Sequence, residues 1–181
     1  MFDLTNKIVV ITGGAGKLGQ KHAEAVAEFK AIPILLDLSK DLTDTVATRI
    51  TRQYGVKSLG FEVDITKEDQ VADCCHKLFD EFGKIDVLIN NATNNPKVET
   101  AEKEQNFSRL ENFDLEIWNQ DIAVGLTGAF LCSKHFGFVI SKNPNGGSII
   151  NISSDLGVIA PNQKLYQKDG LSDEQQTVKP V

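Results

Sequence analysis

The feature that most constrains the fold of this chain is a glycine cluster, Thr12 to Gly19, directly after a short apolar run. That run, Lys7 to Ile11, is rich in β-branched residues and predicts a strand buried on both faces. From Lys17 to Phe29 apolar residues recur at helical intervals, which predicts a helix immediately after the glycines. A strand, a glycine-rich turn and a helix therefore follow one another without a break.

The glycines in this turn have the spacing of a phosphate-binding loop. Gly14, Gly16 and Gly19 satisfy G-x-G-x-x-G in the strand-to-helix context that the motif requires. Glycine permits a tight turn and close backbone approach, and the free amides at the helix start can hold a diphosphate. A P-loop is excluded because Leu18, rather than a hydroxyl residue, follows Lys17. The remaining alternative is a glycine-rich turn that binds nothing.

An acidic residue ends the second predicted strand, Pro33 to Asp37, and lies 18 residues after Gly19. A carboxylate at this place accepts hydrogen bonds from the adenosine ribose of a bound dinucleotide and repels a 2′-phosphate. The sequence therefore favours NAD over NADP, although the cation Lys17 in the loop would tolerate extra negative charge. The structural alternative for Asp37 is a strand-end cap.

Strand and helix patterns alternate along the rest of the chain. The predicted helices are Leu42–Gln53, a helix opened by a Thr66–Asp69 capping box and stopped at Gly83, and Leu115–Ile140; the predicted strands are Ser58–Val63, Ile85–Ile89 and Ser148–Ile152. This alternation predicts an α/β fold: a Rossmann-type, doubly wound parallel sheet with right-handed crossovers. Ligands bind such sheets beyond the carboxyl ends of the strands.

Composition narrows the class of protein further. The 181 residues suit a single domain, 1–181, and 41% hydrophobic with 24% charged residues is ordinary for a globular chain. A net charge of -6 argues against nucleic acid as a partner. The cysteines, Cys74, Cys75 and Cys132, predict neither a disulfide framework nor a metal site. We see no signal peptide and expect no membrane span, so a cytoplasmic location is expected.

Further segments, taken in order, resemble the short-chain dehydrogenase/reductase family. Thr12-Gly13 precedes the loop, Asp64-Ile65 follows the third predicted strand, Asn90-Asn91-Ala92 the fourth, and Asn151-Ile152-Ser153-Ser154 belongs to the end of the fifth. The resemblance implies that Asp64 and Ile65 contact the adenine, and that Asn91 and Ala92 line the cofactor cleft. It also implies that Thr12, Gly13, Gly14, Gly16, Lys17, Leu18, Gly19 and Asp37 bind the cofactor, and that Ser154 is catalytic and hydrogen-bonds the substrate oxygen.

The family's catalytic tyrosine, followed four residues later by a lysine, has no convincing counterpart here. Tyr166 is the only tyrosine after Ser154, but it lies one residue short of the usual offset and Gly170 stands where the lysine is expected. We therefore expect the true pair beyond Val181, in a domain whose last strands and helices this chain lacks.

Three other positions depart from the family pattern. Lys17 replaces a loop glycine, Thr93 replaces the glycine after Asn-Ala, and Gly125 stands where an asparagine normally holds a water of the proton relay. The missing asparagine puts an efficient proton relay in doubt, unless another polar side chain or a backbone carbonyl anchors the water.

The resulting functional hypothesis is an NAD(H)-dependent oxidoreductase that interconverts a carbonyl and an alcohol on a small molecule. The polar segment Thr93–Asn112 hints at a hydroxylated, sugar-like substrate. The alternatives are a catalytically inactive dinucleotide-binding protein or regulatory subunit and, less favoured, a sugar-nucleotide epimerase or dehydratase. The resemblance also implies a homo-oligomer, a dimer or tetramer built on the helix that contains Trp118.

Overall fold

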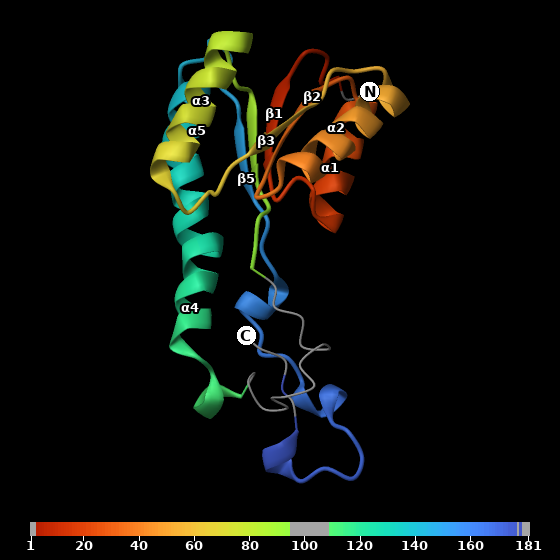
Figure 1. The fold of residues 1–181 in the computed structure, drawn as a ribbon, viewed down its shortest axis with the longest axis vertical. Coiled ribbons are helices and arrows are strands. Elements are labelled where there is room, and N and C mark those ends of the chain that lie inside the picture. Colours follow the sequence, from red (N-terminus) through yellow and green to blue (C-terminus); the bar gives the residue numbers. More distant parts are fainter. Residues whose placement is uncertain (1–2, 95–108, 177, 179–181) are drawn as a thin grey trace. The chain divides into compact units, whose positions relative to one another are not determined.

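The computed structural model describes residues 3–94, 109–176 and 178, and its described part contains the predicted parallel sheet (Figure 1). The strand order is β3-β2-β1-β4-β5, and every pairing is parallel. The strands are β1 (Ile8–Thr12), β2 (Ile32–Asp37), β3 (Leu59–Glu62), β4 (Val87–Asn90) and β5 (Ser148–Asn151). The helices are α1 (Lys17–Glu28), α2 (Lys40–Tyr54), α3 (Glu68–Phe82), α4 (Leu115–Ile122) and α5 (Ala129–Ser141), with a π-helical segment, η3 (Ala123–Gly128). The predicted Rossmann-type fold is confirmed.

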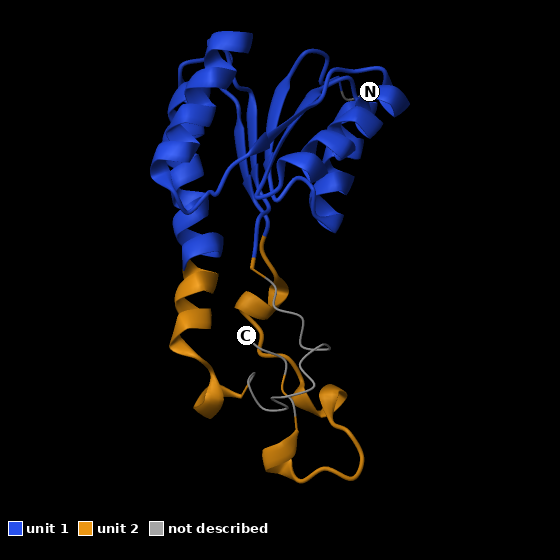
Figure 2. Cartoon of the chain, in the orientation of Figure 1, with its two compact units in different colours: residues 1–93, 123–152 blue, residues 94–122, 153–181 orange. Residues whose placement is uncertain are grey.

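The chain divides into two compact units, which Figure 2 colours separately. The first unit, residues 1–93 and 123–152, contains the whole sheet with α1, α2, α3 and α5. The second unit, residues 94–122 and 153–181, contains α4 and four short 3₁₀ turns in its described part: η2 (Leu110–Asn112), η4 (Asp155–Gly157), η5 (Gln163–Tyr166) and η6 (Asp173–Gln175). Most of the predicted loop Thr93–Asn112 lies outside the described residues.

Strand β1 is the centre of the first unit because it pairs with β2 on one side and β4 on the other. All five of its residues are buried, as predicted for a strand covered on both faces. Helices α1 and α2 cover one face of the sheet and α3 and α5 cover the other (Figure 1). The carboxyl ends of β1, β2 and β4 are thereby brought together at one edge of the sheet.

Strand β5, at the end of the sheet, is the least covered. All four of its residues are exposed, and Ile149 and Ile150 leave 41% and 45% of their surface open to solvent. Its partner β4 buries Leu88, Ile89 and Asn90 in contrast. The first unit therefore covers β5 less than it covers β4.

The predicted capping box at the start of α3 is wrong. The helix begins at Glu68, and its N-terminal boundary residue is Lys67, with no side-chain cap among the described residues. The Thr66 hydroxyl instead donates to Asp64 Oδ1 at 2.6 Å, and the Thr66 amide donates to the same oxygen at 2.9 Å. The carboxylate two residues upstream competes successfully for the threonine, so a local turn replaces the box.

The predicted long helix exists as one stretch, Leu115–Ser141, which contains α4, the π-helical segment η3 and α5. Our expectation that no segment is apolar enough to span a membrane needs correction, because this stretch passes that test by length and composition. Within the first unit, however, α5 buries Leu131, Cys132, Phe136 and Ile140 in the core against the sheet. Of the apolar window itself 22% is buried, and one helix that passes by length and composition does not establish a membrane span.

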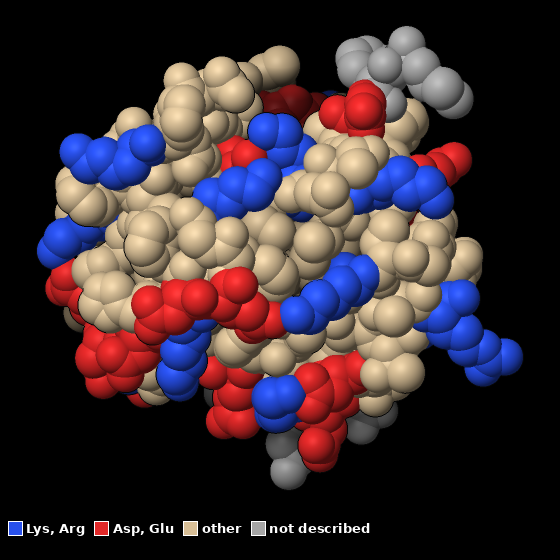
Figure 3. Space-filling model, turned by 90° about the horizontal axis from the view of Figure 1, so that it is seen from above, with Lys and Arg blue, Asp and Glu red and all other residues tan. Residues whose placement is uncertain are grey.

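The amino edge of the sheet is closed by Asp86, which precedes β4. Its carboxylate is 5% exposed and accepts from Lys7 Nζ at 2.8 Å, Lys84 Nζ at 2.9 Å and the Ile8 amide at 2.9 Å. Burial acts to raise the pKa of Asp86, but these hydrogen bonds outweigh it and hold the pKa below its usual value. Figure 3, which views the molecule from the top of Figure 1, shows basic and acidic side chains sharing this face.

Replacing Asp86 by asparagine, Asp86→Asn, should destabilise the protein by about 2 kcal/mol, because the buried Ile8 amide and two partly exposed lysines lose their charged acceptor. The lowered pKa means that this contribution is present above the unfolded-state pKa of about 4 and is lost as the pH falls through the folded-state value. Urea unfolding at pH 7 and pH 3 measures both effects. Asp44→Asn, at an exposed pair with Lys40, is the control and should change stability by less than about 0.5 kcal/mol. Equal losses for the two variants would contradict this role.

Candidate functional site

The candidate site is the loop between β1 and α1, at the carboxyl edge of the sheet. Gly16 is the N-terminal boundary residue of α1, and no described side chain caps the helix. The first-turn amides of Lys17, Leu18 and Gly19 therefore point out of the helix start without a side-chain acceptor. Partial positive charge at a helix N-terminus favours an anion there, so this loop has the electrostatics of a phosphate site.

Two glycines of the loop are required by its geometry. Gly13 has φ +63, and a Cβ built there would lie 3.0 Å from Ala92 Cα. A Cβ on Gly19 would lie 2.1 Å from the Gly13 carbonyl oxygen, a distance that no side chain tolerates. Helix α1 therefore packs directly on the turn, and this close approach keeps the first-turn amides beside the loop backbone.

The end of β1 is hydrogen-bonded to the segment that follows β4. Thr12 is 1% exposed, and its hydroxyl oxygen accepts from the Asn91 and Ala92 amides, both at 3.0 Å. The Asn91 side-chain amide donates back to Thr12 O at 2.9 Å and to Gly13 O at 3.3 Å. The structure thus brings Thr12, Gly13, Asn91 and Ala92 together at one edge of the loop.

Asp37, at the end of β2, lies against the other edge of the loop. Its Oδ2 accepts from the Ala15 amide at 3.0 Å and its Oδ1 from the Leu38 amide at 2.9 Å. The carboxylate is therefore held beside the glycine turn. The loop is also bonded to β2 itself, because the Gly14 amide donates to Leu36 O at 3.0 Å.

Asp64 and Ile65 follow β3, and the contacts of both residues stabilise the fold. Asp64 Oδ1 accepts both hydrogen bonds of Thr66, and the Asp64 amide donates to Gln70 Oε1 at 2.8 Å. Ile65 is 7% exposed and belongs to the core, where its side chain lies over Gly128 of η3. No described contact joins either residue to the glycine loop.

Ser154 belongs to the second unit, whereas the glycine loop belongs to the first. Its hydroxyl caps η4 by accepting from the Leu156 amide at 3.2 Å, and it donates to Asp155 Oδ1 at 3.2 Å. Tyr166 ends η5 in the same unit and is 41% exposed. Gly170 has φ +82, a backbone conformation that would strain the lysine expected at the family position.

Two side-chain networks were missed by sequence reasoning. One joins the strand ends: Asn90 Nδ2 donates to Asn151 Oδ1 at 2.8 Å and to Ser133 Oγ at 3.1 Å, linking β4, β5 and α5. The other joins Gln20 on α1 and Arg49 on α2 to the glycine loop, with Arg49 Nη2 donating to Gln20 Oε1 at 3.0 Å. The asparagines follow strands and could have been suspected, but nothing local in the sequence marks Arg49.

The cysteines have the surroundings of structural thiols. All three are free and buried. Burial raises the pKa of Cys74 to about 12, of Cys75 to about 11 and of Cys132 to about 12. Such thiols stay protonated at neutral pH and are poor nucleophiles. The described residues contain no group of histidine, cysteine and carboxylate side chains that could hold a metal ion.

The parallel sheet, the uncapped helix start and the acidic end of β2 define a Rossmann-type nucleotide-binding architecture. The model of the short chain dehydrogenase family matches residues 7–167, which is most of the chain. This protein belongs to the short-chain dehydrogenase/reductase family of oxidoreductases. The resemblance noted from the motifs is confirmed.

Two curated relatives illustrate the range of the family near this chain. An uncharacterised oxidoreductase of Bacillus subtilis (strain 168), YxbG, is 35% identical over 154 residues, which cover 85% of this chain and 52% of the relative. The NAD-dependent glycerol dehydrogenase of Listeria innocua is 32% identical over 159 residues, covering 88% of this chain and 57% of the relative. The chain thus spans about half the length of the curated relatives it matches.

Solved structures agree with this placement. The crystal structure of an NAD⁺-bound xylitol dehydrogenase matches with a TM-score of 0.77 at 25% identity, over 88% of this chain and 57% of that chain. The fold of the family is therefore present in the part of the chain that the structure describes.

Replacing Gly19 by alanine, Gly19→Ala, should push α1 away from the turn, because the new methyl group would overlap the Gly13 carbonyl oxygen. We expect a loss of about 2 kcal/mol of stability and at least about tenfold weaker dinucleotide binding. Urea unfolding and calorimetric titration of NAD measure the two effects.

The matched control is Gly125→Ala, another helical glycine, whose new methyl group would meet nothing within 4 Å. It should change stability by no more than about 1 kcal/mol and leave binding unaltered. If Gly19→Ala behaved like this control, the close approach would not be required.

Proposed function

We propose that this protein is an NAD(H)-dependent oxidoreductase that interconverts a carbonyl and an alcohol on a small hydroxylated molecule. The observation that carries the proposal is the pairing of an uncapped α1 start with a carboxylate, Asp37, held against the same loop. The start of α1 can bind a diphosphate, and the Asp37 carboxylate can accept hydrogen bonds from the hydroxyls of the neighbouring ribose. Bound NAD would supply the hydride acceptor, and NADH the donor.

The residues of the loop fit such a cofactor on geometric grounds. The amides of Lys17, Leu18 and Gly19 would hold the diphosphate, and the absence of a Cβ at Gly13 leaves the turn backbone open to close approach. One side of this loop is fixed by the hydrogen bonds among Thr12, Asn91 and Ala92. The loop backbone also includes Gly14 and Gly16. We assign the adenine contact to Asp64 and Ile65 on the family resemblance alone.

Asp37 supports NAD rather than NADP. A carboxylate next to the ribose accepts hydrogen bonds from free hydroxyls, whereas a 2′-phosphate would bring two negative groups together. The named activity of the Listeria relative, which is NAD-dependent, is in line with this choice. That relative acts on glycerol and the structural neighbour on xylitol, so a polyol or sugar-like substrate is the class we propose.

Ser154 is our proposed substrate-orienting residue, through a hydrogen bond from its hydroxyl to the reacting oxygen. The general acid and base would be a tyrosine assisted by a lysine, which lowers the phenol pKa toward neutrality. Tyr166 does not fit that role, since Gly170 replaces the lysine and has a left-handed backbone. We therefore place the pair outside residues 1–181.

One observation favours the alternative of a dinucleotide-binding protein without turnover. Gly125 has no side chain to anchor a relay water, although the π-helical turn around it leaves open space. A water held by a backbone carbonyl of that wide turn would preserve the relay and the enzymatic function. Measuring NADH formation with glycerol, xylitol and related polyols in the natural full-length protein separates the two functions.

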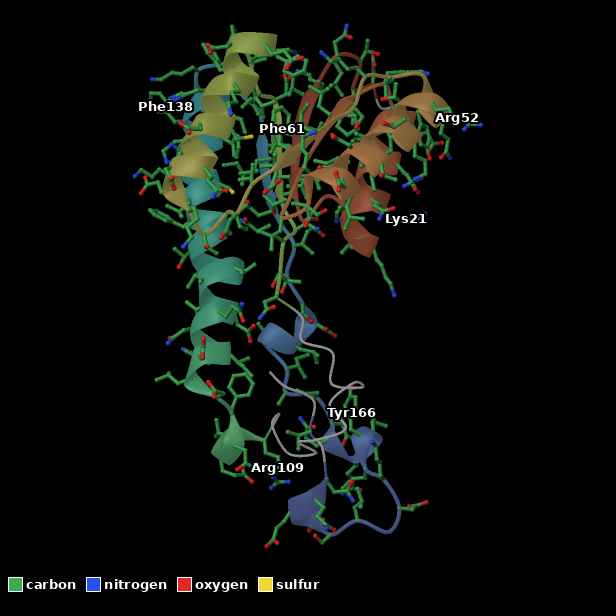
Figure 4. All side chains as sticks on the ribbon, in the orientation of Figure 1. Lys21, Arg52, Phe61, Arg109, Phe138 and Tyr166 are labelled. Carbon is green, nitrogen blue, oxygen red and sulfur yellow. The ribbon has the colours of Figure 1, made fainter. Side chains whose placement is uncertain are left out.

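We also propose a cytoplasmic protein that forms a homo-oligomer through the helix containing Trp118. On this helix Leu126 and Phe130 leave 65% and 62% of their surface exposed, which is unusual for large apolar side chains. Phe138 lies on the outer side of α5 (Figure 4), with Lys142 Nζ 4.8 Å from its ring centre. A net charge of -6 gives no support to nucleic acid as a partner.

Replacing Asp37 by alanine, Asp37→Ala, should weaken NAD binding about tenfold and reduce the discrimination against NADP, because a charged acceptor is lost and a repulsion relieved. Calorimetric titration of NAD and NADP against both proteins measures the change. Asp41→Ala, an exposed carboxylate in the first turn of α2, controls for the loss of one negative charge. Tighter binding of NADP than of NAD by the unaltered protein would overturn the cofactor assignment.

A further inference from the structure

We infer that Gln20 and Arg49 are positioning residues that hold the Ala15–Gly16 peptide in the orientation needed to bind a diphosphate. The inference rests on the proposed function of the loop and extends it to two helices. The two residues form a hydrogen-bond relay that runs from α2 through α1 to the loop backbone. Neither residue belongs to the glycine motif.

The Ala15–Gly16 peptide is held at both of its polar atoms. Gln20 Nε2 donates to Ala15 O at 2.6 Å, and the Gly16 amide donates to Gly13 O at 3.1 Å. On the other side of the same residue, the Ala15 amide donates to Asp37 Oδ2 at 3.0 Å. Without the Gln20 bond, the Ala15 carbonyl oxygen would lose its hydrogen-bond donor and only the Gly16 amide would hold this peptide, which would allow the carbonyl to tilt. A carbonyl dipole aimed at the start of α1 would oppose an anion bound there.

Arg49 determines which way the Gln20 amide faces. Its Nη2 donates to Gln20 Oε1 at 3.0 Å, and a guanidinium can only donate. The oxygen of Gln20 must therefore face Arg49, which leaves its NH₂ group to face Ala15 O. The relay thus has one consistent set of donors and acceptors from α2 to the loop.

The position of Arg49 is itself determined by a second contact on α1. Its Nη1 donates to Glu24 Oε1 at 2.7 Å, and Glu24 also accepts from Lys21 Nζ at 2.7 Å. The Glu24 side chain is 17% exposed, so this acceptor is well shielded from solvent. The hydrogen bonds from Lys21 and Arg49 lower the pKa of Glu24, which keeps it ionised at neutral pH.

The packing of α1 against α2 does not by itself require the hydrogen bonds of the Gln20 side chain. The Arg49–Glu24 ion pair already joins the two helices, while Gln20 adds a bond that ends on the loop backbone rather than on a helix. A structural role alone predicts a change in stability when Gln20 is replaced. A positioning role predicts a change in cofactor affinity that stability does not explain.

Two substitutions separate these roles. Gln20→Met keeps the length of the side chain without a donor or a charge, and Gln20→Glu keeps the acceptor for Arg49 but cannot donate to Ala15 O when ionised. We expect both to raise the Kd for NAD about tenfold, the effect of losing one partly buried hydrogen bond. Gln20→Glu should unfold at the same temperature as the unaltered protein or higher, because it gains an ion pair with Arg49.

Arg49→Met tests the second step of the relay. It should weaken NAD binding in the same direction, and the double variant with Gln20→Met should be no weaker than Gln20→Met alone, because both act through one bond. Lys21→Ala is the control. It removes the other partner of Glu24 from the exposed surface of α1 (Figure 4) and should leave the Kd unchanged.

The measurements are calorimetric titration of NAD and thermal unfolding without ligand, both on the natural full-length protein. If the unaltered protein binds NAD and the two Gln20 variants bind it with the same Kd, the relay is refuted and the proposed function stands. If only Gln20→Glu binds more weakly, charge repulsion explains the effect and the relay is again refuted. Failure of the unaltered protein to bind NAD, NADH and NADPH would overturn the proposed function and this inference together.

Discussion

The contact between α1 and the turn that precedes it is the constraint on which the rest of the site depends. Because Gly19 has no Cβ, the helix begins directly over the Gly13 carbonyl oxygen. Its first turn is consequently held against the turn that leaves the buried strand β1. Any larger residue at this position would separate the helix dipole from the sheet edge, and with it the positive end that an anion needs.

An aspartate carboxylate accepts hydrogen bonds at each of the two edges of the sheet, but the consequences differ. At the amino edge the Asp86 carboxylate takes three donors and closes the fold, with little capacity left for a ligand. At the carboxyl edge Asp37 takes two backbone amides, one of them from the loop itself. The Asp86 carboxylate is fully engaged by donors of the protein, whereas the amides at the start of α1 have no side-chain acceptor. This asymmetry is why a ligand site is expected at one edge and a structural cluster at the other.

Much of this arrangement could be predicted from the sequence because it depends on local patterns. The β-branched run of β1, the glycine spacing and the acidic end of β2 can each be recognised within a few residues. The alternation of strands and helices then predicts a parallel sheet with right-handed crossovers, but not the order of its strands. The capping box predicted at Thr66 is wrong because a nearby carboxylate competes for the same hydroxyl. The Gln20–Arg49 relay could not be predicted, since the two residues are 29 positions apart and meet only when α1 packs beside α2.

The most direct test of anion binding at the start of α1 is a nuclear magnetic resonance titration of the ¹⁵N-labelled protein with NAD. If the loop between β1 and α1 holds the diphosphate, the amide resonances of Gly13 to Gly19 should shift most. Those of Lys17, Leu18 and Gly19 should move downfield as their protons gain an acceptor. Saturating shifts confined to another part of the chain, with these amides unmoved, would contradict the central claim.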